Sequence, residues 1–302
     1  MILKAKEPIS LPSYKGSALR GVFGSALRRT VCILKKSTCV DCPFKFNCVY
    51  SAIMETPIPK DHPDSRKYKN APHPYIIIPP LTSRQHFEPG DGMSFEVVLI
   101  GKANEYLPYF IYAFTEMGRL GIGKGKGKFD VTSVQALDLK DQEKEIFNGT
   151  KLLASLENRI DYKSFKDEKF QGEEITLSFE TPVRIKVNER LSSDIPFELL
   201  IRRLSERAFL LANLHCGAEL DNFGKFAKGS EEVRIVRNKL HWQDWERYSS
   251  RQQTRMKFGG WVGEIIYQGD FQRFLPLLRL GEHIHVGKNT TFGLGKYRII
   301  GF

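Results

Sequence analysis

The sequence predicts an α+β protein in which a strand–helix–strand–strand–helix–strand unit occurs twice. A shift of 168 residues (275 minus 107) places Leu107–Pro108 over Leu275–Pro276 and Gly125–Phe129 over Gly293–Tyr297. A repeat of this length indicates a duplicated domain, because solenoid repeats are only about 20–50 residues long. In each copy an extended run, a helix and a glycine-rich loop follow one another. This order is typical of the ferredoxin-like (RRM-like, βαββαβ) fold, an antiparallel sheet with both helices on one face.

The first copy contains six predicted elements between residues 2 and 137. Its first helix carries apolar residues from Leu19 to Leu34 at helical spacing. In its second helix the apolar residues recur at the i, i+3, i+4, i+7 spacing of one helix face. These residues are Leu107, Phe110, Ile111, Phe114 and Met117. The four predicted strands are Ile2–Ile9, Pro74–Pro80, Phe95–Ile100 and Lys128–Leu137.

The second copy repeats the same order from residue 175 onward. Asp194 and Pro196 are typical of a helix start, because proline is favoured in the first turn. The predicted strands are Ile175–Val187, Val233–Tyr248, Trp261–Tyr267 and Lys296–Phe302. We therefore predict a domain over 1–138, a polar linker over 139–172 with a short helix near Lys151–Ile160, and a domain over 173–302 with its glycine-rich loop at 281–295.

Length and composition restrict the class of protein. At about 150 residues a domain, 302 residues make two domains, and a 41% apolar content excludes wholesale disorder. The apolar run Tyr75–Ile78 is far shorter than the roughly 18 residues that a membrane span needs. The N-terminus, MILKAKEPIS, lacks the apolar segment of a secretory signal. We expect a soluble cytoplasmic protein without a membrane partner.

The charge distribution favours a polyanionic partner. The formal net charge is +11, and residues 1–54 hold nine Lys or Arg against two acids. Residues 271–302 hold five against one, whereas residues 138–174 hold ten acids and seven bases. Basic ends around an acidic middle indicate one basic surface built from both termini. A generally basic protein without such a surface is the alternative.

Four of the five cysteines lie close together, as Cys32, Cys39, Cys42 and Cys48. A Cys-x2-Cys turn presents two thiolates to one ion, and zinc takes four ligands in a tetrahedron. Disulfides are rare inside cells, so we predict one structural Zn²⁺ in a knuckle over residues 32–48. An iron–sulfur cluster and unliganded thiols are the alternatives. A site made of four thiolates has no open position for water, so no catalytic metal is expected here.

Two glycine-rich loops alternate with lysines. Gly121–Lys128 contains Lys124, Lys126 and Lys128, and Gly287–Lys296 ends in Lys296. Glycines let backbone amides approach a phosphate while the lysines supply charge, so we predict contacts with a nucleic-acid backbone. Neither loop matches the phosphate loop of nucleotide hydrolases, which needs Ser or Thr after its final lysine. Two flexible basic turns are the alternative.

The first helix shows a polar face with two glycines. Arg20, Gly21, Gly24 and Arg28 lie opposite its apolar face. Glycine costs about 1 kcal/mol in a helix interior relative to alanine, so something must come close here. An RNA backbone held between Arg20 and Arg28 and a tight contact with another helix are both consistent with this pattern.

His283 and His285 lie beside Lys288 in the second loop. A histidine exchanges a proton near neutrality, and a lysine stabilises the charge that develops on a phosphorane. His62, His73 and His86 lie among prolines and charges, and we expect them in loops. No quartet of Asp and Glu suitable for a two-metal nuclease is present.

The tandem halves, the cysteine segment after the first helix and the closing run Leu277–Gly295 resemble one known family. It is the CRISPR-associated precursor-crRNA processing endoribonuclease family of the RAMP superfamily. Its signature loop is glycine, an apolar residue, glycine, five residues, then glycine, an apolar residue and glycine. Val286–Gly287, Lys288–Phe292 and Gly293–Gly295 follow that pattern, with His285 in place of the first glycine.

The resemblance implies a metal-independent cut in CRISPR repeat RNA. The 2′-hydroxyl of the RNA would attack, leaving a 2′,3′-cyclic phosphate and a 5′-hydroxyl. The family often uses a histidine of the N-terminal half, but this chain has none before His62. We therefore predict His285 as proton donor or acceptor, Lys288 on the phosphorane, and Tyr14 or Lys15 as second partner. CRISPR repeat RNA or crRNA, and subunits of a CRISPR effector complex, are the implied partners.

Two other classes of function stay open. The chain could be a non-catalytic RAMP subunit that binds crRNA in an effector complex, which the missing N-terminal histidine favours. It could also be a general RNA-binding module without a role in CRISPR. Cleavage of repeat RNA in EDTA separates a nuclease from either binder.

Overall fold

The computed structural model describes the whole chain except residues 36–37, 157–158, 189, 221, 250–253, 258 and 302. The chain forms two compact units, each with its own sheet and helices. The first contains Met1–Arg159 with Leu210–Ala218, and the second contains Ile160–Phe209 with Glu219–Phe302. The α+β class predicted from the sequence is confirmed. The region predicted as a linker is divided between the two units at residue 159.

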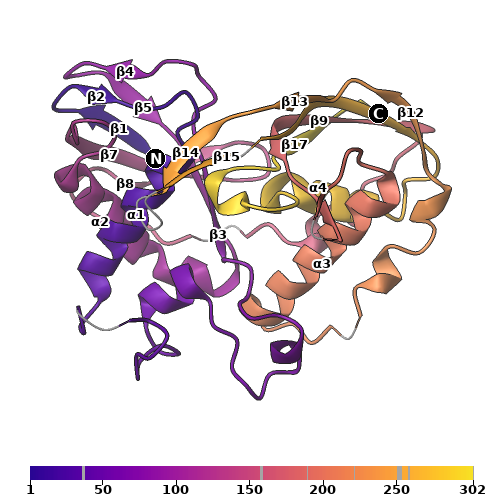
Figure 1. The fold of residues 1–302 in the computed structure, drawn as a ribbon, viewed down its shortest axis with the longest axis horizontal. Coiled ribbons are helices and arrows are strands. Elements are labelled where there is room, and N and C mark those ends of the chain that lie inside the picture. The colour runs from indigo at the N-terminus through magenta and orange to yellow at the C-terminus, as the bar shows by residue number, and fades with distance from the viewer. Residues whose placement is uncertain are drawn as a thin grey trace. The chain divides into compact units, whose positions relative to one another are not determined.

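The first unit is an antiparallel sheet covered by two helices. Its strand order is β5-β1-β7-β8, and the neighbouring strand β6 pairs with β3. Figure 1 shows the two helices α1 and α2 side by side beneath these strands. The strands are β1 (Ile2–Ala5), β3 (Tyr75–Ile78), β5 (Gly92–Ser94), β6 (Glu96–Leu99), β7 (Phe129–Leu137) and β8 (Glu143–Phe147). The helices are α1 (Gly16–Val31) and α2 (Leu107–Leu120).

Aromatic side chains hold the helices of the first unit to its sheet. The ring of Phe23 on α1 stacks on Phe114 and Phe110 of α2, with centroids 4.6 and 5.1 Å away. Tyr75 of β3 meets the same cluster, at 5.7 Å from Phe23. All four side chains are at most 1% exposed, so the predicted apolar faces form this core.

A pair of two-residue strands stands beside the main sheet. β2 (Ile9–Ser10) follows β1, and β4 (His86–Phe87) lies between β3 and β5 along the chain. The two strands pair antiparallel, with Ile9 opposite Phe87 and Ser10 opposite His86. His86 therefore lies on a strand, and the predicted loop position is wrong. A strand this short forms only by pairing with a distant segment, which local sequence does not reveal.

The second unit repeats this arrangement. Its sheet order is β12-β16-β9-β17, with β13 also paired to β16, and all pairs are antiparallel. Its main strands are β9 (Glu174–Val183), β12 (Arg234–Asn238), β13 (His241–Gln243), β16 (Gly260–Gln268) and β17 (Tyr297–Gly301). Its helices are α3 (Phe197–His215), which belongs to this unit as far as Phe209, and α4 (Leu275–Ile284). Two separate hairpins join β10 (Lys186–Val187) to β11 (Arg190–Leu191) and β14 (Glu246–Ser249) to β15 (Thr254–Lys257).

The duplication is visible at the boundaries of the elements. Helix α2 begins at Leu107 and α4 begins at Leu275, each with proline in its first turn. Strand β7 begins at Phe129 and β17 at Tyr297. Both pairs of starts differ by the 168 residues of the sequence repeat (275 minus 107 and 297 minus 129). The predicted repeat is therefore confirmed in the elements that follow β6 and β16.

The segment predicted as a linker contains the strand β8 and, at Tyr162–Phe165, a short 3-10 helix. β8 pairs with β7, and Leu152 forms a bridge with Phe147. No helix lies between 151 and 160 in the described residues, and the short helix of this segment begins at Tyr162, just beyond the predicted range. Ile146 and Phe147 are 1% and 9% exposed, so the end of this strand anchors the acidic segment in the core of the first unit. Among the described helices, none has the length and apolar character needed to cross a membrane.

Candidate nucleic-acid interface

The first glycine–lysine loop lies against the short strand β2. The amide of Lys124 donates to the carbonyl oxygen of Ser10 at 2.9 Å, and the two residues form an antiparallel bridge. On its other side Ser10 is paired with His86 of β4. Three backbone segments, far apart in the sequence, thus place Lys124, Ser10 and His86 in one row.

The side chains of this row face outward. Directly opposed residues of antiparallel strands project to the same face, and successive residues alternate between faces. Ile9 and Phe87 are each 4% exposed and form the inner pair. Ser10 and His86 therefore project to the outer face, where His86 and Lys124 are exposed. We call Lys124, Ser10 and His86 the outer row.

The glycines of this loop serve mainly the protein's own backbone. A Cβ at Gly123 would overlap the carbonyl of Ser10, and a Cβ at Gly127 would overlap that of Pro8. At Gly121 it would overlap the carbonyl of Lys126. At Gly125 there is open space, and a φ of +88° favours glycine there. Close approach by a phosphate, predicted for the whole loop, is therefore open at Gly125 only.

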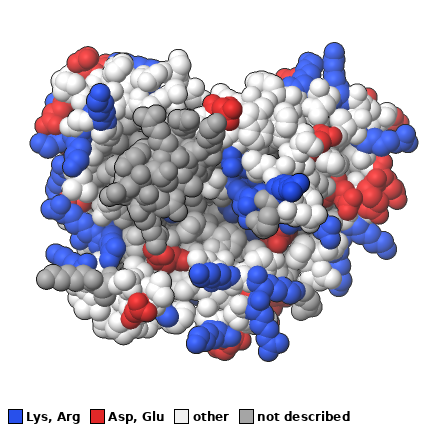
Figure 2. Space-filling view, in the orientation of Figure 1, with Lys and Arg blue, Asp and Glu red and all other residues white. Residues whose placement is uncertain are grey.

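The lysines of this loop differ in their contacts. Lys124 and Lys126 are exposed at the loop tip. The ammonium of Lys128 forms an ion pair with Glu7 at 3.0 Å, and this hydrogen bond lowers the pKa of the Glu7 carboxyl. Figure 2 shows further Lys and Arg side chains along the left edge of the face drawn, where Figure 1 has α1 and α2. The first unit thus presents a basic surface suited to a polyanion.

Tyr14 and Lys15 stand immediately before α1. Lys15 is fully buried, and its ammonium donates to the carbonyl oxygens of Ser13 and Thr82 at 3.0 and 2.8 Å. Burial lowers the pKa of the Lys15 ammonium and raises the pKa of the half-buried Tyr14 hydroxyl far above its usual range. Lys15 therefore holds the segment that leads to His86, and its buried ammonium does not fit the predicted role of contacting the RNA.

The glycine face of α1 combines both predicted alternatives. A Cβ at Gly24 would come within 2.6 Å of Met54 Cε, so this glycine serves tight packing against the π-helix Ser51–Glu55. Gly21 is exposed and has nothing within 4 Å, which leaves it open to a ligand. The Arg20 guanidinium donates a hydrogen bond to the buried Tyr75 hydroxyl.

Arg28 lies beside the cysteine segment. Its guanidinium donates a hydrogen bond to the Cys32 side chain and lies 5.9 Å from the centre of the Tyr50 ring. Burial raises the pKa of the Cys39 thiol, and Cys32 and Cys48 are near enough to raise it further. No group of three or more His, Cys, Asp or Glu in the described residues is arranged to hold a metal. The zinc site over Cys32, Cys39, Cys42 and Cys48 stays a prediction.

The second glycine loop buries the histidine that we predicted as the proton-transferring group. His285 is 0% exposed, and its Nδ1 lies 3.2 Å from the Leu294 carbonyl oxygen. Burial, together with the nearby cations Arg207 and Lys296, lowers its pKa to about 3. Nε2 is buried without a hydrogen-bond partner in the described part of the chain. An imidazole enclosed in this way cannot touch RNA, so the predicted catalytic role does not fit its position.

The lysines of the second loop also separate into two kinds. Lys288 is exposed, and its amide donates to the Arg184 carbonyl oxygen at 2.8 Å. Lys296 is 13% exposed in its side chain and forms an ion pair with Glu180 at 3.0 Å. Lys296 is therefore a structural cation, and Lys288 alone of the two presents its charge outward.

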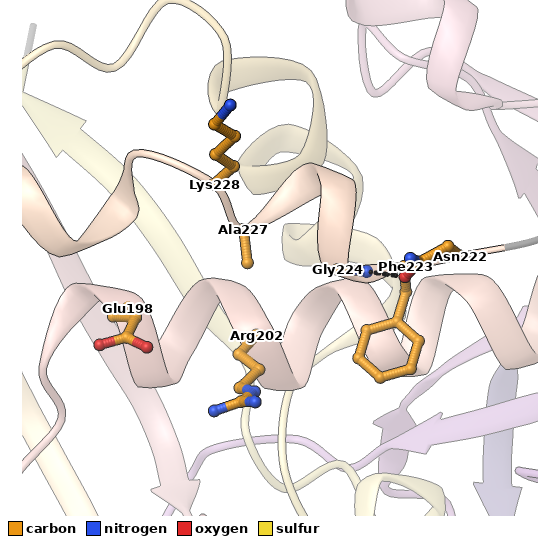
Figure 3. Close-up of a pocket in the computed structure, with 7 residues that line it drawn as sticks. All are labelled: Glu198, Arg202, Asn222, Phe223, Gly224, Ala227 and Lys228. Carbon is orange, nitrogen blue, oxygen red and sulfur yellow. Dashed lines mark hydrogen bonds between the residues drawn. The ribbon is translucent and has the colours of Figure 1, made fainter.

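A shallow hollow of about 390 Å³ lies along α3 in the second unit. Figure 3 shows Glu198 and Arg202 on α3 and Lys228 on the segment above it, with Arg202 and Lys228 pointing in opposite directions. The Gly224 amide donates a hydrogen bond to Asn222 Oδ1 at 2.7 Å, drawn as a dashed line in Figure 3. Side chains that diverge do not form a converging set of donors, so this hollow is not the reaction site.

Two family models match the chain, one over each unit. Residues 1–159 match a model named AF_1859_N, which is described as an N-terminal domain. Residues 177–297 match the model of the CRISPR-associated endoribonuclease Cas6. The first match covers more than half of the chain, so the chain belongs to the family of proteins that carry this N-terminal domain, and its second unit is similar to Cas6.

Known proteins are similar to this chain in sequence or in fold. An uncharacterized protein of Archaeoglobus fulgidus is 26% identical over 291 residues, which are 96% of this chain and 92% of the relative. The product complex of a Thermus thermophilus Cas6 has the same fold, with a TM-score of 0.57 and 13% identity over 99% of this chain and 98% of that one. A chain of a partial Cas6-RT-Cas1–Cas2 complex has a TM-score of 0.51 and 16% identity, over 99% of this chain and 44% of that one.

The candidate residues from the two units fall within different family models. The match to the Cas6 model includes the loop with His285 and Lys288, whereas the N-terminal model includes the outer row. Sequence reasoning missed His86, which no local pattern marks. The sequence offers one weak sign of this pairing: Ile9-Ser10 and His86-Phe87 each consist of one apolar and one polar residue.

Proposed function

We propose that the chain binds CRISPR repeat RNA and cuts it without a catalytic metal to produce crRNA. The observation that carries this proposal is the outer row: a histidine and a lysine exposed on one face of the first unit, in a chain whose second unit matches the Cas6 model. Lys126 adds a second exposed charge beside this row. Sequence-independent binding to RNA rests on such contacts with phosphates.

The proposed reaction requires few catalytic groups from the protein. The RNA supplies its own nucleophile, the 2′-hydroxyl, which attacks the neighbouring phosphate and expels the 5′-oxygen. The chain must hold these atoms in line, move protons and stabilise the extra negative charge of the phosphorane. Exposed lysines and one histidine meet these requirements, and the products are a 2′,3′-cyclic phosphate and a 5′-hydroxyl.

The test is incubation of purified protein with its repeat RNA in EDTA. Cleavage should proceed and should stop when the nucleotide 5′ of the cut carries a 2′-deoxyribose, because the nucleophile is then missing. Products with a 3′-hydroxyl would contradict the mechanism. Tight binding without any cut would instead favour the non-catalytic crRNA-binding subunit.

We also propose that the chain works with other CRISPR proteins. The support is its similarity to a chain of a Cas6-RT-Cas1–Cas2 complex. Tagged protein isolated from cells that express the CRISPR proteins encoded with it should retain crRNA and at least one of those proteins. Recovery of crRNA alone would limit the partners to RNA.

A further inference from the structure

We propose that His86 is the residue that takes the proton from the attacking 2′-hydroxyl, with Lys124 beside it on the phosphate. The inference rests on the proposed function and assigns its chemistry to the outer row. In the step, the 2′-O–H bond breaks and its proton goes to the neutral imidazole. The O2′–P bond forms, the P–O5′ bond breaks, and water supplies a proton to the leaving 5′-oxygen.

The spacing of the outer row suits one phosphodiester. Neighbouring strands lie about 4.8 Å apart, and directly opposed residues have Cβ atoms about 5 Å apart. Ser10 stands between His86 and Lys124 and is small, so the two longer side chains flank a space above it. An imidazole at one side and an ammonium at the other can reach the sugar hydroxyl and the phosphate oxygens of one nucleotide step.

The segment that carries His86 is firmly held. The Arg84 guanidinium donates to the His86 carbonyl oxygen at 2.8 Å and pairs with Asp91. The buried ammonium of Lys15 holds the carbonyl of Thr82 at 2.8 Å. The Arg84 guanidinium also lies 4.7 Å from the centre of the Phe87 ring. These contacts fix the backbone on which His86 is presented, and they make Lys15 a positioning residue for it.

The other histidines are less suited to the role. All seven lie in the described part of the chain, and His86 and His241 are the exposed ones. Nδ1 of His62 accepts from the Asp64 amide, and His285 is fully buried. His241 lies on β13 opposite the apolar Val262 and no lysine shares its strand pair. His86 combines exposure with an exposed lysine in the same row of paired residues.

The experiment compares single-turnover cleavage at saturating protein for four forms of the full chain. These are the wild type, His86→Ala, His86→Gln and the matched control His241→Ala. Loss of a general base slows the step about 10²–10⁴-fold, so both His86 variants should be slower by that factor. Their RNA affinity should stay within about threefold of wild type, because the imidazole acts on the transition state. His241→Ala should cut normally.

Chemical rescue separates lost chemistry from lost structure. Added imidazole should restore part of the cleavage by His86→Ala, and none in a misfolded protein; thermal unfolding midpoints of all forms check folding independently. A wild-type protein that cuts, with His86 variants that cut equally fast, overturns the assignment and leaves the proposed function intact. A wild-type protein that binds repeat RNA and never cuts it overturns the cleavage and the assignment together.

Discussion

The two copies of the repeat use their glycine-rich loops in different ways. In the first copy, Lys124 and Lys126 are exposed at the tip of the loop. In the second copy, Thr290–Leu294 is buried and Lys296 is ion-paired with Glu180. One backbone plan thus gives a loop that faces solvent and a loop that packs inside its own unit.

The residues between the glycines explain this difference. From Gly123 to Gly127 the first loop has lysines between its glycines and no apolar side chain to bury. The second loop contains Phe292 and Leu294, which are 7% and 0% exposed and draw the loop into the core. Glycines therefore set the path of the backbone, whereas the residues between them decide whether the loop faces solvent or packs into the core.

Alanine at the last glycine of each loop should have the largest effect on stability. A Cβ at Gly127 would overlap the Pro8 carbonyl, and a Cβ at Gly295 would overlap the carbonyl of Val286. Because backbone cannot yield as a side chain does, we expect each substitution to cost roughly 3 kcal/mol or more. Hydrogen exchange should show the loss in the unit that carries the change, at β7 or at β17.

Gly125→Ala is the matched control for this pair. Nothing lies within 4 Å of its Cβ position, and the remaining penalty is the left-handed φ of +88°, about 1–2 kcal/mol. Equal losses for Gly125→Ala and Gly127→Ala would show that strain, and not close packing, sets the path of the first loop.

His285 should make the second unit sensitive to acid. Its pKa is lowered to about 3 by burial, so the folded state keeps it neutral while the unfolded state binds a proton below about pH 6.5. The stabilisation is complete above pH 6.5 and is lost as the pH falls toward 3. Between pH 7 and pH 5 the free energy of unfolding should fall by about 2 kcal/mol from this group alone.

His285→Gly tests the acid effect directly. His285 has a φ of +58° and a ψ of 170°, a region that glycine favours, so the substitution relieves strain while removing the titrating group. All three tryptophans, Trp242, Trp245 and Trp261, belong to the second unit, so their fluorescence in urea follows its unfolding. A variant that keeps the full pH dependence of the wild type would assign the effect to other groups.

Much of the fold could be predicted from the sequence. The starts of α2 and α4, at Leu107 and Leu275, follow from proline and apolar spacing, which are local properties. The strand β8 in the segment after Asp138 was not predicted, because it exists through its pairing with β7 and such pairing is tertiary. The same reason hid the strand of His86.

The candidate site was less predictable, because burial determines which of its side chains are accessible to RNA. His285 and His86 have comparable polar and glycine-rich sequence neighbours, yet one is enclosed by a helix end and the other is exposed on a sheet. Lys128 and Lys296 look like phosphate ligands in sequence but are paired with Glu7 and Glu180. Such partners lie more than 100 residues away, beyond any local pattern.

The lysines should separate in the salt dependence of RNA binding. Each lysine that contacts a phosphate of single-stranded RNA contributes about 0.7 to the slope of log K against log salt. Lys124→Ala and Lys126→Ala should each lower the slope by about that amount, and Lys296→Ala should leave it unchanged. An equal decrease for Lys296→Ala would mean that its ion pair with Glu180 opens to RNA.

Removal of metal should have the smallest effect on cleavage. The cysteine segment is present after α1 in the first copy and absent after α3 in the second, so a zinc ion there would stabilise an insertion and not the shared fold. Metal analysis of protein purified without added metal should find about one zinc per chain, which Cys39→Ser with Cys42→Ser abolishes.

Chelation should leave the cleavage rate unchanged, because the RNA carries its own nucleophile and the charges of the outer row come from side chains. Folded protein without zinc would contradict the predicted knuckle, whereas cleavage that stops in EDTA and resumes with Mg²⁺ would contradict metal-independent chemistry.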